Sequence, residues 1–133
     1  MAKSTGLGWT TLSLDSAAPS LTDIRNDVTN FNFAMPRGVQ DTTGVDKSAY
    51  ERLLLLADFS GSLNGVFNVS TSHPVLKTIP SYAGPRTLSL GVASQTLSNE
   101  VHCTDYQLTR GNDGALTWSV PFVLADGTVP AWS

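Results

Sequence analysis

The stretch Leu116-Thr117-Trp118-Ser119-Val120-Pro121-Phe122 decides the class of fold of this chain. Large apolar residues take every second position, and Thr, Ser and Pro stand between them. Because successive side chains of a β-strand point to opposite faces, this period of two predicts a strand with one buried face and one polar face. One-sided strands of this kind are typical of antiparallel sheets.

The same alternation recurs in earlier parts of the chain. Its clearest further examples are residues 11–14, 30–35 and 87–92. Gly111-Asn112-Asp113-Gly114 predicts a hairpin loop leading into the Trp118 strand. Ser94-Gln95 predicts another turn, and Asp126-Gly127 closes the last strand. Many short strands joined by such turns predict an all-β fold, an antiparallel β-sandwich or barrel.

Three segments need separate treatment. Ser72-His73-Pro74, followed by an apolar run and Pro80, predicts a short, capped helix over about 73–79. The segment 59–67 is predicted as one strand rather than a hairpin turning at Asn64-Gly65. The stretch from about 37 to 58 is open, because its periodicity fits both a helix over 47–56 capped by Asp46 and an extended arm.

The composition favours association over catalysis. The 133 residues predict a single domain, 1–133, and only 14% of them are charged, against about 25% in an average soluble domain. Interface cores are depleted of charge, so a subunit largely covered by neighbours would have this composition. The net charge is −3 and the 8 Lys and Arg residues are scattered, which argues against specific nucleic-acid binding.

Targeting and membrane signals are weak in this sequence. Residues 1–6 lack the apolar stretch of a secretory signal, so we expect synthesis in a cytoplasm. The longest apolar run, Leu53–Ala57, is too short to span a bilayer, and we expect no membrane anchor.

The residues that could carry chemistry do not form a recognisable catalytic or metal-binding motif. His73 and His102 are far apart in the sequence, and neither has the spacing of a metal-binding pair. On a strand, Cys103 would point away from its neighbour His102, which argues against a thiolate pair and for a core position. We therefore expect no enzyme activity, no metal and no cofactor.

A family resemblance rests on motifs spread over most of the chain. In order, they are Val39-Gln40-Asp41-Thr42-Thr43, the leucine run 53–56 followed by Asp58, Leu63-Asn64-Gly65-Val66-Phe67, Thr104–Leu108, Gly114–Trp118 and Gly127–Trp132. In this order and spacing the chain resembles the major tail (tail tube) proteins of long-tailed bacteriophages.

The resemblance implies a tail-tube β-sandwich with one short flanking helix and a long extended loop over about 37–58. It implies a structural virion protein of the tail, assembled in the bacterial host cytoplasm. Its subunits would form hexameric rings that stack into a tube, through which DNA passes without specific binding. The partners would be copies of the chain, a tape-measure protein, and tail terminator and baseplate proteins.

The resemblance also suggests where the contacts lie. Asp41 is the candidate for a residue facing the channel. The candidate inter-subunit loop residues are Arg37, Asp46, Lys47, Tyr50, Glu51 and Arg52.

Two alternatives belong to other functional classes. One is a different virion β-domain, such as a capsid decoration or head–tail connector protein. The other is a carbohydrate-binding module, in which Trp9, Trp118 or Trp132 would stack on sugar rings. Packing inside the domain is the simpler role for these tryptophans, since Trp118 falls on the apolar face of its strand.

Overall fold

A computed structural model describes residues 3–7, 9–15 and 21–133. In this part of the chain every regular element except one short helix is an antiparallel strand, as predicted. In chain order the elements are β1 Thr11–Asp15, β2 Leu21–Asp23, β3 Val28–Ala34, β4 Arg37–Asp41, β5 Arg52–Ala57, β6 Ser60–Val66, α1 Ser72–Leu76, β7 Arg86–Val92, β8 Gln95–Cys103, β9 Gln107–Arg110 and β10 Leu116–Leu124.

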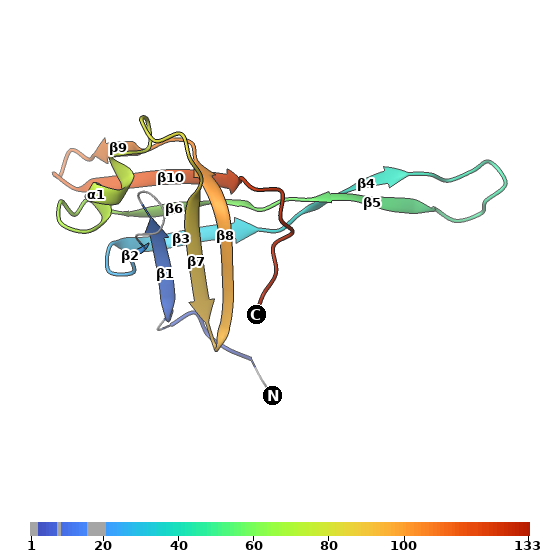
Figure 1. The fold of residues 1–133 in the computed structure, drawn as a ribbon, viewed down its shortest axis with the longest axis horizontal. Helices are drawn as coiled ribbons and strands as arrows, with labels where there is room; N and C mark the ends of the chain where they lie inside the picture. The colour runs from blue at the N-terminus through green and yellow to red at the C-terminus, as the bar shows by residue number, and fades with distance from the viewer. Residues whose placement is uncertain (1–2, 8, 16–20) are drawn as a thin grey trace.

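The strands form one large sheet and one separate hairpin. The large sheet has the order β2-β1-β7-β8-β10-β6-β3, with β9 pairing to β10. Among the described strands, β4 and β5 pair only with each other. Figure 1 shows β1, β7 and β8 running across the direction of β3, β6 and β10. The large sheet therefore folds over on itself and encloses a core as a sandwich does.

Strand β8 makes the corner between the two halves of the sandwich. Residues 95–101 of β8 pair with β7, and its last residues, Val101 to Cys103, pair with the end of β10. Apolar side chains from both halves then meet in one cluster. Its buried members are Leu12, Leu14, Ile24, Phe59, Leu63, Val75, Leu76, Leu88, Leu90, Leu97, Val101, Trp118, Val120 and Phe122.

Two glycines of β6 let the aromatic residues of β10 lie against that strand. Gly65 is paired with Trp118, and Gly61 is paired with Phe122. A Cβ atom on residue 65 would stand 2.6 Å from Trp118 Cζ2 and 2.2 Å from the carbonyl oxygen of Asp27. The Trp118 indole completes the arrangement, since its Nε1 donates a hydrogen bond of 2.9 Å to the carbonyl oxygen of Val66. Segment 60–66 is one strand, as predicted.

The predicted helix forms but is shorter than expected. It spans Ser72–Leu76 instead of 73–79, and turns follow it. Ser72 does not cap it, because this residue lies inside the first turn and its hydroxyl has no hydrogen-bond partner. A residue distant in sequence takes that role: the buried carboxylate of Asp27 accepts hydrogen bonds from the Ser72 amide at 3.1 Å and from the Thr71 hydroxyl.

The hairpin turns agree closely with the sequence pattern. The loop of residues 111–114 joins β9 to β10. The β7–β8 turn lies one residue earlier than predicted, at Ala93 and Ser94, whose φ angles of 52° and 66° are in the left-handed region.

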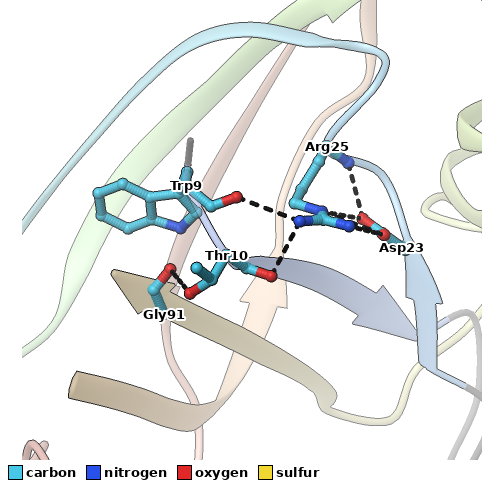
Figure 2. A network of polar contacts seen from close by, with 5 residues as sticks. All are labelled: Trp9, Thr10, Asp23, Arg25 and Gly91. Atoms are coloured by element: carbon cyan, nitrogen blue, oxygen red, sulfur yellow. Dashed lines mark hydrogen bonds and ion pairs between the residues drawn. The ribbon is translucent and has the colours of Figure 1, made fainter. Parts of the chain in front are cut away.

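An ion pair fastens the N-terminal segment to the sheet (Figure 2). The Arg25 guanidinium forms a fork with the carboxylate of Asp23, in which Nε donates to Oδ1 and Nη2 donates to Oδ2. Its Nη1 donates to the carbonyl oxygens of Trp9 and Thr10 at 3.3 and 3.0 Å. The Thr10 hydroxyl in turn donates to the carbonyl oxygen of Gly91 at 2.8 Å. An exposed ion pair contributes little stability by itself, so its effect here is to orient the backbone leading into β1.

The glycine–aromatic pairing gives the first prediction. Gly65→Ala should destabilise the isolated chain by about 3 kcal/mol, because the new methyl group meets backbone and indole atoms that cannot both move away. Chemical denaturation followed by tryptophan fluorescence measures this loss. Gly6→Ala is the control, since a Cβ there meets nothing within 4 Å. Equal stabilities of the two variants would contradict the pairing as a packing constraint.

Candidate subunit interface

The β4–β5 hairpin projects from the sandwich as an arm (Figure 1). We use "arm" for residues 37–57, with a tip of residues 42–51. The arm continues the β3–β6 pair, since Pro36 separates β3 from β4 and Asp58-Phe59 separates β5 from β6. At its base the Asp58 amide donates to the carbonyl oxygen of Pro36 at 2.9 Å. The extended alternative is therefore correct, as a paired hairpin, and the helix over 47–56 does not form.

The arm exposes its leucines on both faces. The exposed fractions are 57% for Leu53, 62% for Leu54, 45% for Leu55 and 90% for Leu56. Leu54 is paired with Val39, which is itself 51% exposed, and these two share a face. A two-stranded hairpin is only marginally stable in water, and an exposed apolar patch of this kind marks an interaction site. The arm thus has the properties of an element that a partner completes.

Hydrogen bonds give the tip of the arm a defined conformation. The Thr43 hydroxyl donates to Asp41 Oδ1 at 2.6 Å and accepts from the Glu51 amide at 2.8 Å. The Thr43 amide also donates to Asp41 Oδ1, at 3.0 Å. These bonds, the hydroxyl first, hold the pKa of Asp41 below its usual value of 3.8. A charged Asp41 therefore helps to order the tip.

All of the predicted inter-subunit residues lie on the arm and are exposed. Arg37 is at its base, where Nε donates to the carbonyl oxygen of Leu55 at 3.1 Å. Asp46 and Lys47 are paired at 3.7 Å in the tip. Tyr50 lies under the guanidinium of Arg52, which is 4.6 Å from the ring centroid.

The remaining residue of this set, Glu51, precedes Arg52. Its carbonyl oxygen accepts a hydrogen bond from the Thr42 amide, which closes the tip. Asp41 lies on the same arm, in β4, and not on the large sheet. A contact between subunits through these residues, and a channel position for Asp41, remain predictions.

The body of the molecule offers open strand edges besides the arm. β3 and β9 lie at opposite sides of the layer β9-β10-β6-β3, and each is paired on one side only within the described part of the chain. β3 is 7 residues long and contains no Lys or Pro. Long edges without such protection are prone to pair with another chain. These edges cannot be recognised in the sequence, because pairing order is not visible in local alternation.

The two histidines and the cysteine, which the sequence offers for chemistry, lie in packed or surface positions. His73 Nδ1 lies 3.1 Å from the Tyr106 hydroxyl, and its ring packs on Phe67. Burial raises the pKa of the Cys103 thiol to about 11, which makes it a poor nucleophile. His102 is exposed, on the face opposite to Cys103. In the ranges 3–7, 9–15 and 21–133, no three His, Cys, Asp or Glu side chains are grouped to hold a metal ion.

Trp9 and Trp118 pack within the sandwich, and Trp132 packs at its surface, where it is 39% exposed. Trp118 is 1% exposed, so its face is not available to a sugar ring. Trp9 meets Phe31 edge-on at 4.9 Å, and Trp132 lies 6.0 Å from Phe33.

Among the described residues, no helix combines the length and the apolar character needed to cross a membrane.

Comparison with known proteins gives structural matches only. No protein-family model matches the chain, and no curated protein sequence does. Solved structures do match. A chain in the virion of a native gene transfer agent (GTA) particle has a TM-score of 0.76 at 12% identity, over 98% of this chain and 99% of that one. The chain has the fold of a subunit from such a particle.

Two further structures extend this likeness. A chain in the tail of an empty GTA particle, described with C6 symmetry, has a TM-score of 0.75 at 14% identity and covers 98% of both chains. A chain in the six-fold symmetrised baseplate of the anti-feeding prophage has a TM-score of 0.60 at 11% identity, over 98% of this chain and 97% of that one. At these identities the likeness establishes the fold.

The tip of the arm yields the second prediction. Thr43→Val should raise the pKa of Asp41 toward 3.8, because the variant loses the hydroxyl that favours the carboxylate. Because the folded-state pKa of Asp41 lies below 3.8, this carboxylate stabilises the tip fully above pH 3.8. The stabilisation is lost as the pH falls through the folded-state pKa. An NMR titration of the Asp41 carboxyl measures the shift. Thr42→Val is the control, since that hydroxyl bonds Glu51 instead; an unchanged Asp41 titration in Thr43→Val would refute the assignment.

Proposed function

We propose that the chain is a phage-type tail tube subunit. Six copies would form a ring, and the rings would stack into a hollow tube through which DNA is delivered. The observation that carries the proposal is the arm, whose leucines stay exposed in a single copy. The fold shared with a chain from a C6-symmetric tail supports the symmetry of the ring.

Ring closure would use the open edges of the sandwich. A contact between two different edges of the same chain is heterologous, and such contacts close into a ring when the rotation between copies allows it. β3 of one copy and β9 of the next are suited to this, because they bound the same four-strand layer on opposite sides. Pairing them around an axis would remove both edges, as a closed barrel does.

Stacking would use the arm. Because it projects beyond the sandwich, the arm can reach a copy outside its own ring. Burying the leucines there would remove apolar surface from water, which stabilises an assembly by about 25 cal/mol for each Å² covered. The exposed Asp46, Lys47 and Glu51 at the tip would set orientation more than affinity, as charges at the rim of an interface do.

The remaining partners follow from the same proposal. A tape-measure protein would occupy the channel before DNA does, and terminator and baseplate proteins would close the two ends. The assembled protein would be located in the virion tail, after assembly in the host cytoplasm.

The third prediction tests the arm as the stacking element. The double variant Leu54→Glu, Leu56→Glu should abolish tube formation, because charges would have to be buried at the contact. Negative-stain electron microscopy of concentrated protein measures it. The isolated chain should keep its stability within about 0.5 kcal/mol, since both side chains are already exposed in it.

The matched control is Leu54→Met, Leu56→Met, which keeps the arm apolar and should still form tubes. Tubes in the glutamate variant would refute the role of the arm. If the unmodified protein remains a monodisperse monomer in light scattering at every concentration and salt tried, the tube function itself fails.

The likeness to a chain of a baseplate structure favours one second candidate. A baseplate or connector subunit would also form rings, but these rings would not stack. Micrographs with single rings and no tubes would select this function over the tube.

A further inference from the structure

One edge of β8 is covered by the segment that follows β10. Residues 95–101 of β8 pair with β7 on one side, and residues 101–103 pair with β10 on the other. The second edge of residues 95–100 therefore lies outside the pairing of the named strands. Figure 1 shows the last segment of the chain running beside this part of β8. We call residues 125–133 the strap.

The strap is bonded to β8 at its two ends. At one end the Ala125 amide donates to the carbonyl oxygen of Glu100 at 3.0 Å. At the other end Thr96 and Ser133 exchange two backbone hydrogen bonds, each of 2.9 Å. Two residues that exchange both bonds form the repeating unit of an antiparallel ladder. The far end of the strap therefore lies against β8 as a neighbouring strand would.

The middle of the strap is not bonded to β8. Among the described residues, no backbone hydrogen bond joins residues 126–131 to this strand. Gly127 has a φ of 73°, which interrupts the extended course of the strap, and Pro130 has no amide hydrogen to donate. Backbone groups alternate between the two edges of a strand, so those of Ser98 face the strap as those of Thr96 do. Ser98 thus has no backbone partner on this edge within the described part of the chain.

The ring of Trp132 adds the apolar part of the attachment. Trp132 forms an isolated antiparallel bridge with Leu97, and its ring lies 6.0 Å from that of Phe33 in β3. The ring is only partly covered, since Trp132 is 39% exposed, and Val129 of the strap is 67% exposed. A segment with few buried apolar contacts opens locally more readily than the core of the same domain. The strap is therefore a cover that can be displaced.

We propose that the strap is an autoinhibitory contact, which closes the β8 edge against strand addition by a second copy of the chain. An uncovered edge presents a row of unpaired N–H and C=O groups, and proteins cover such edges with loops or protect them with charges and prolines. Residues 95–100 contain a single charged residue, Glu100, and no lysine or proline. The strap is thus the main protection of this edge.

The covered edge differs in its geometry from the open edges of β3 and β9. A strand added to residues 95–100 would extend the half of the sandwich made of β2, β1, β7 and β8. Two copies joined there would not continue the layer β9-β10-β6-β3, so the contact would compete with any pairing of β3 with β9. The inference does not depend on the proposed ring or tube, because it needs only the edge and its cover.

The first experiment measures whether the strap covers the edge. The double variant Trp132→Ala, Ser133→Pro, called the released variant, loses the ring against Phe33 and the amide that donates to Thr96. Hydrogen exchange of the Thr96 amide should become severalfold faster, because the strap no longer holds its acceptor in place. The Leu97 amide faces β7 and should keep its protection, which shows that the sheet is intact.

The matched control is the double variant Val129→Ala, Ser133→Ala. It loses an exposed apolar side chain of the same segment but keeps the backbone amide of residue 133 and the Trp132 ring. Exchange at Thr96 should equal that of the unmodified protein. Equal exchange in the released variant and in the control would overturn the strap as the cover of β8.

The second experiment measures association by light scattering, at a dilution where the unmodified protein and the control are monomeric. The mean mass of the released variant should rise about twofold or more, because its β8 edge is open to a second copy. Adding Ser98→Lys to the released variant should return the mass to that of one chain. Ser98 is exposed, and a lysine on an open edge opposes pairing with another strand.

Two results would overturn the autoinhibitory role. One is an unchanged mass of the released variant, and the other is a rise in mass that Ser98→Lys does not reverse. Neither result bears on tubes. The tube function is tested on the unmodified protein at high concentration, so the failure of one proposal is distinguishable from the failure of the other.

Discussion

The close approach of β6 and β10 is the constraint on which the rest of the structure depends. Gly61 and Gly65 leave room for Phe122 and Trp118 directly opposite them, so two large rings lie across a strand that has no side chains at those positions. The rings then fill the space between the two halves of the sandwich. Because β10 also pairs with β8 and β9, its position sets the corner of the sheet and the open edge beyond it.

The molecule divides its apolar surface between two uses. Most leucines and aromatic residues of the sandwich are buried or partly buried within one copy, whereas all four leucines of the arm are exposed. The sparse charge of the chain fits this division, because surfaces that partners cover need few solubilising groups. A single copy is thus a folded domain with an exposed apolar extension, and the association that we propose would depend on the exposed leucines more than on charges.

Local sequence patterns predicted much of this fold. The strand through Trp118, the single strand of residues 60–66 and the loop at 111–114 follow from alternation and turn residues, which act over a few positions. The helix was predicted too long at its C-terminal end, where turns follow Leu76. Its N-terminal partner, Asp27, lies 45 residues before Ser72, so no local pattern identifies it. Strand order and the open edges depend on pairings between distant segments, so no local pattern reveals them. The leucine run was recognisable as a segment without a clear period, but periodicity alone did not distinguish a helix from an arm.

The junction of the arm with the sandwich has a mechanical consequence. β3 leads into β4 through Pro36, β5 leads into β6 through Asp58, and one backbone hydrogen bond joins Pro36 to Asp58 between the two paired regions. A force applied to the tip would therefore be transmitted along both strands of the arm into the layer that holds the glycine–aromatic pairs. The junction is weakly bonded, so it would bend before the packed interior deforms. Bending strain would therefore be concentrated at the junction.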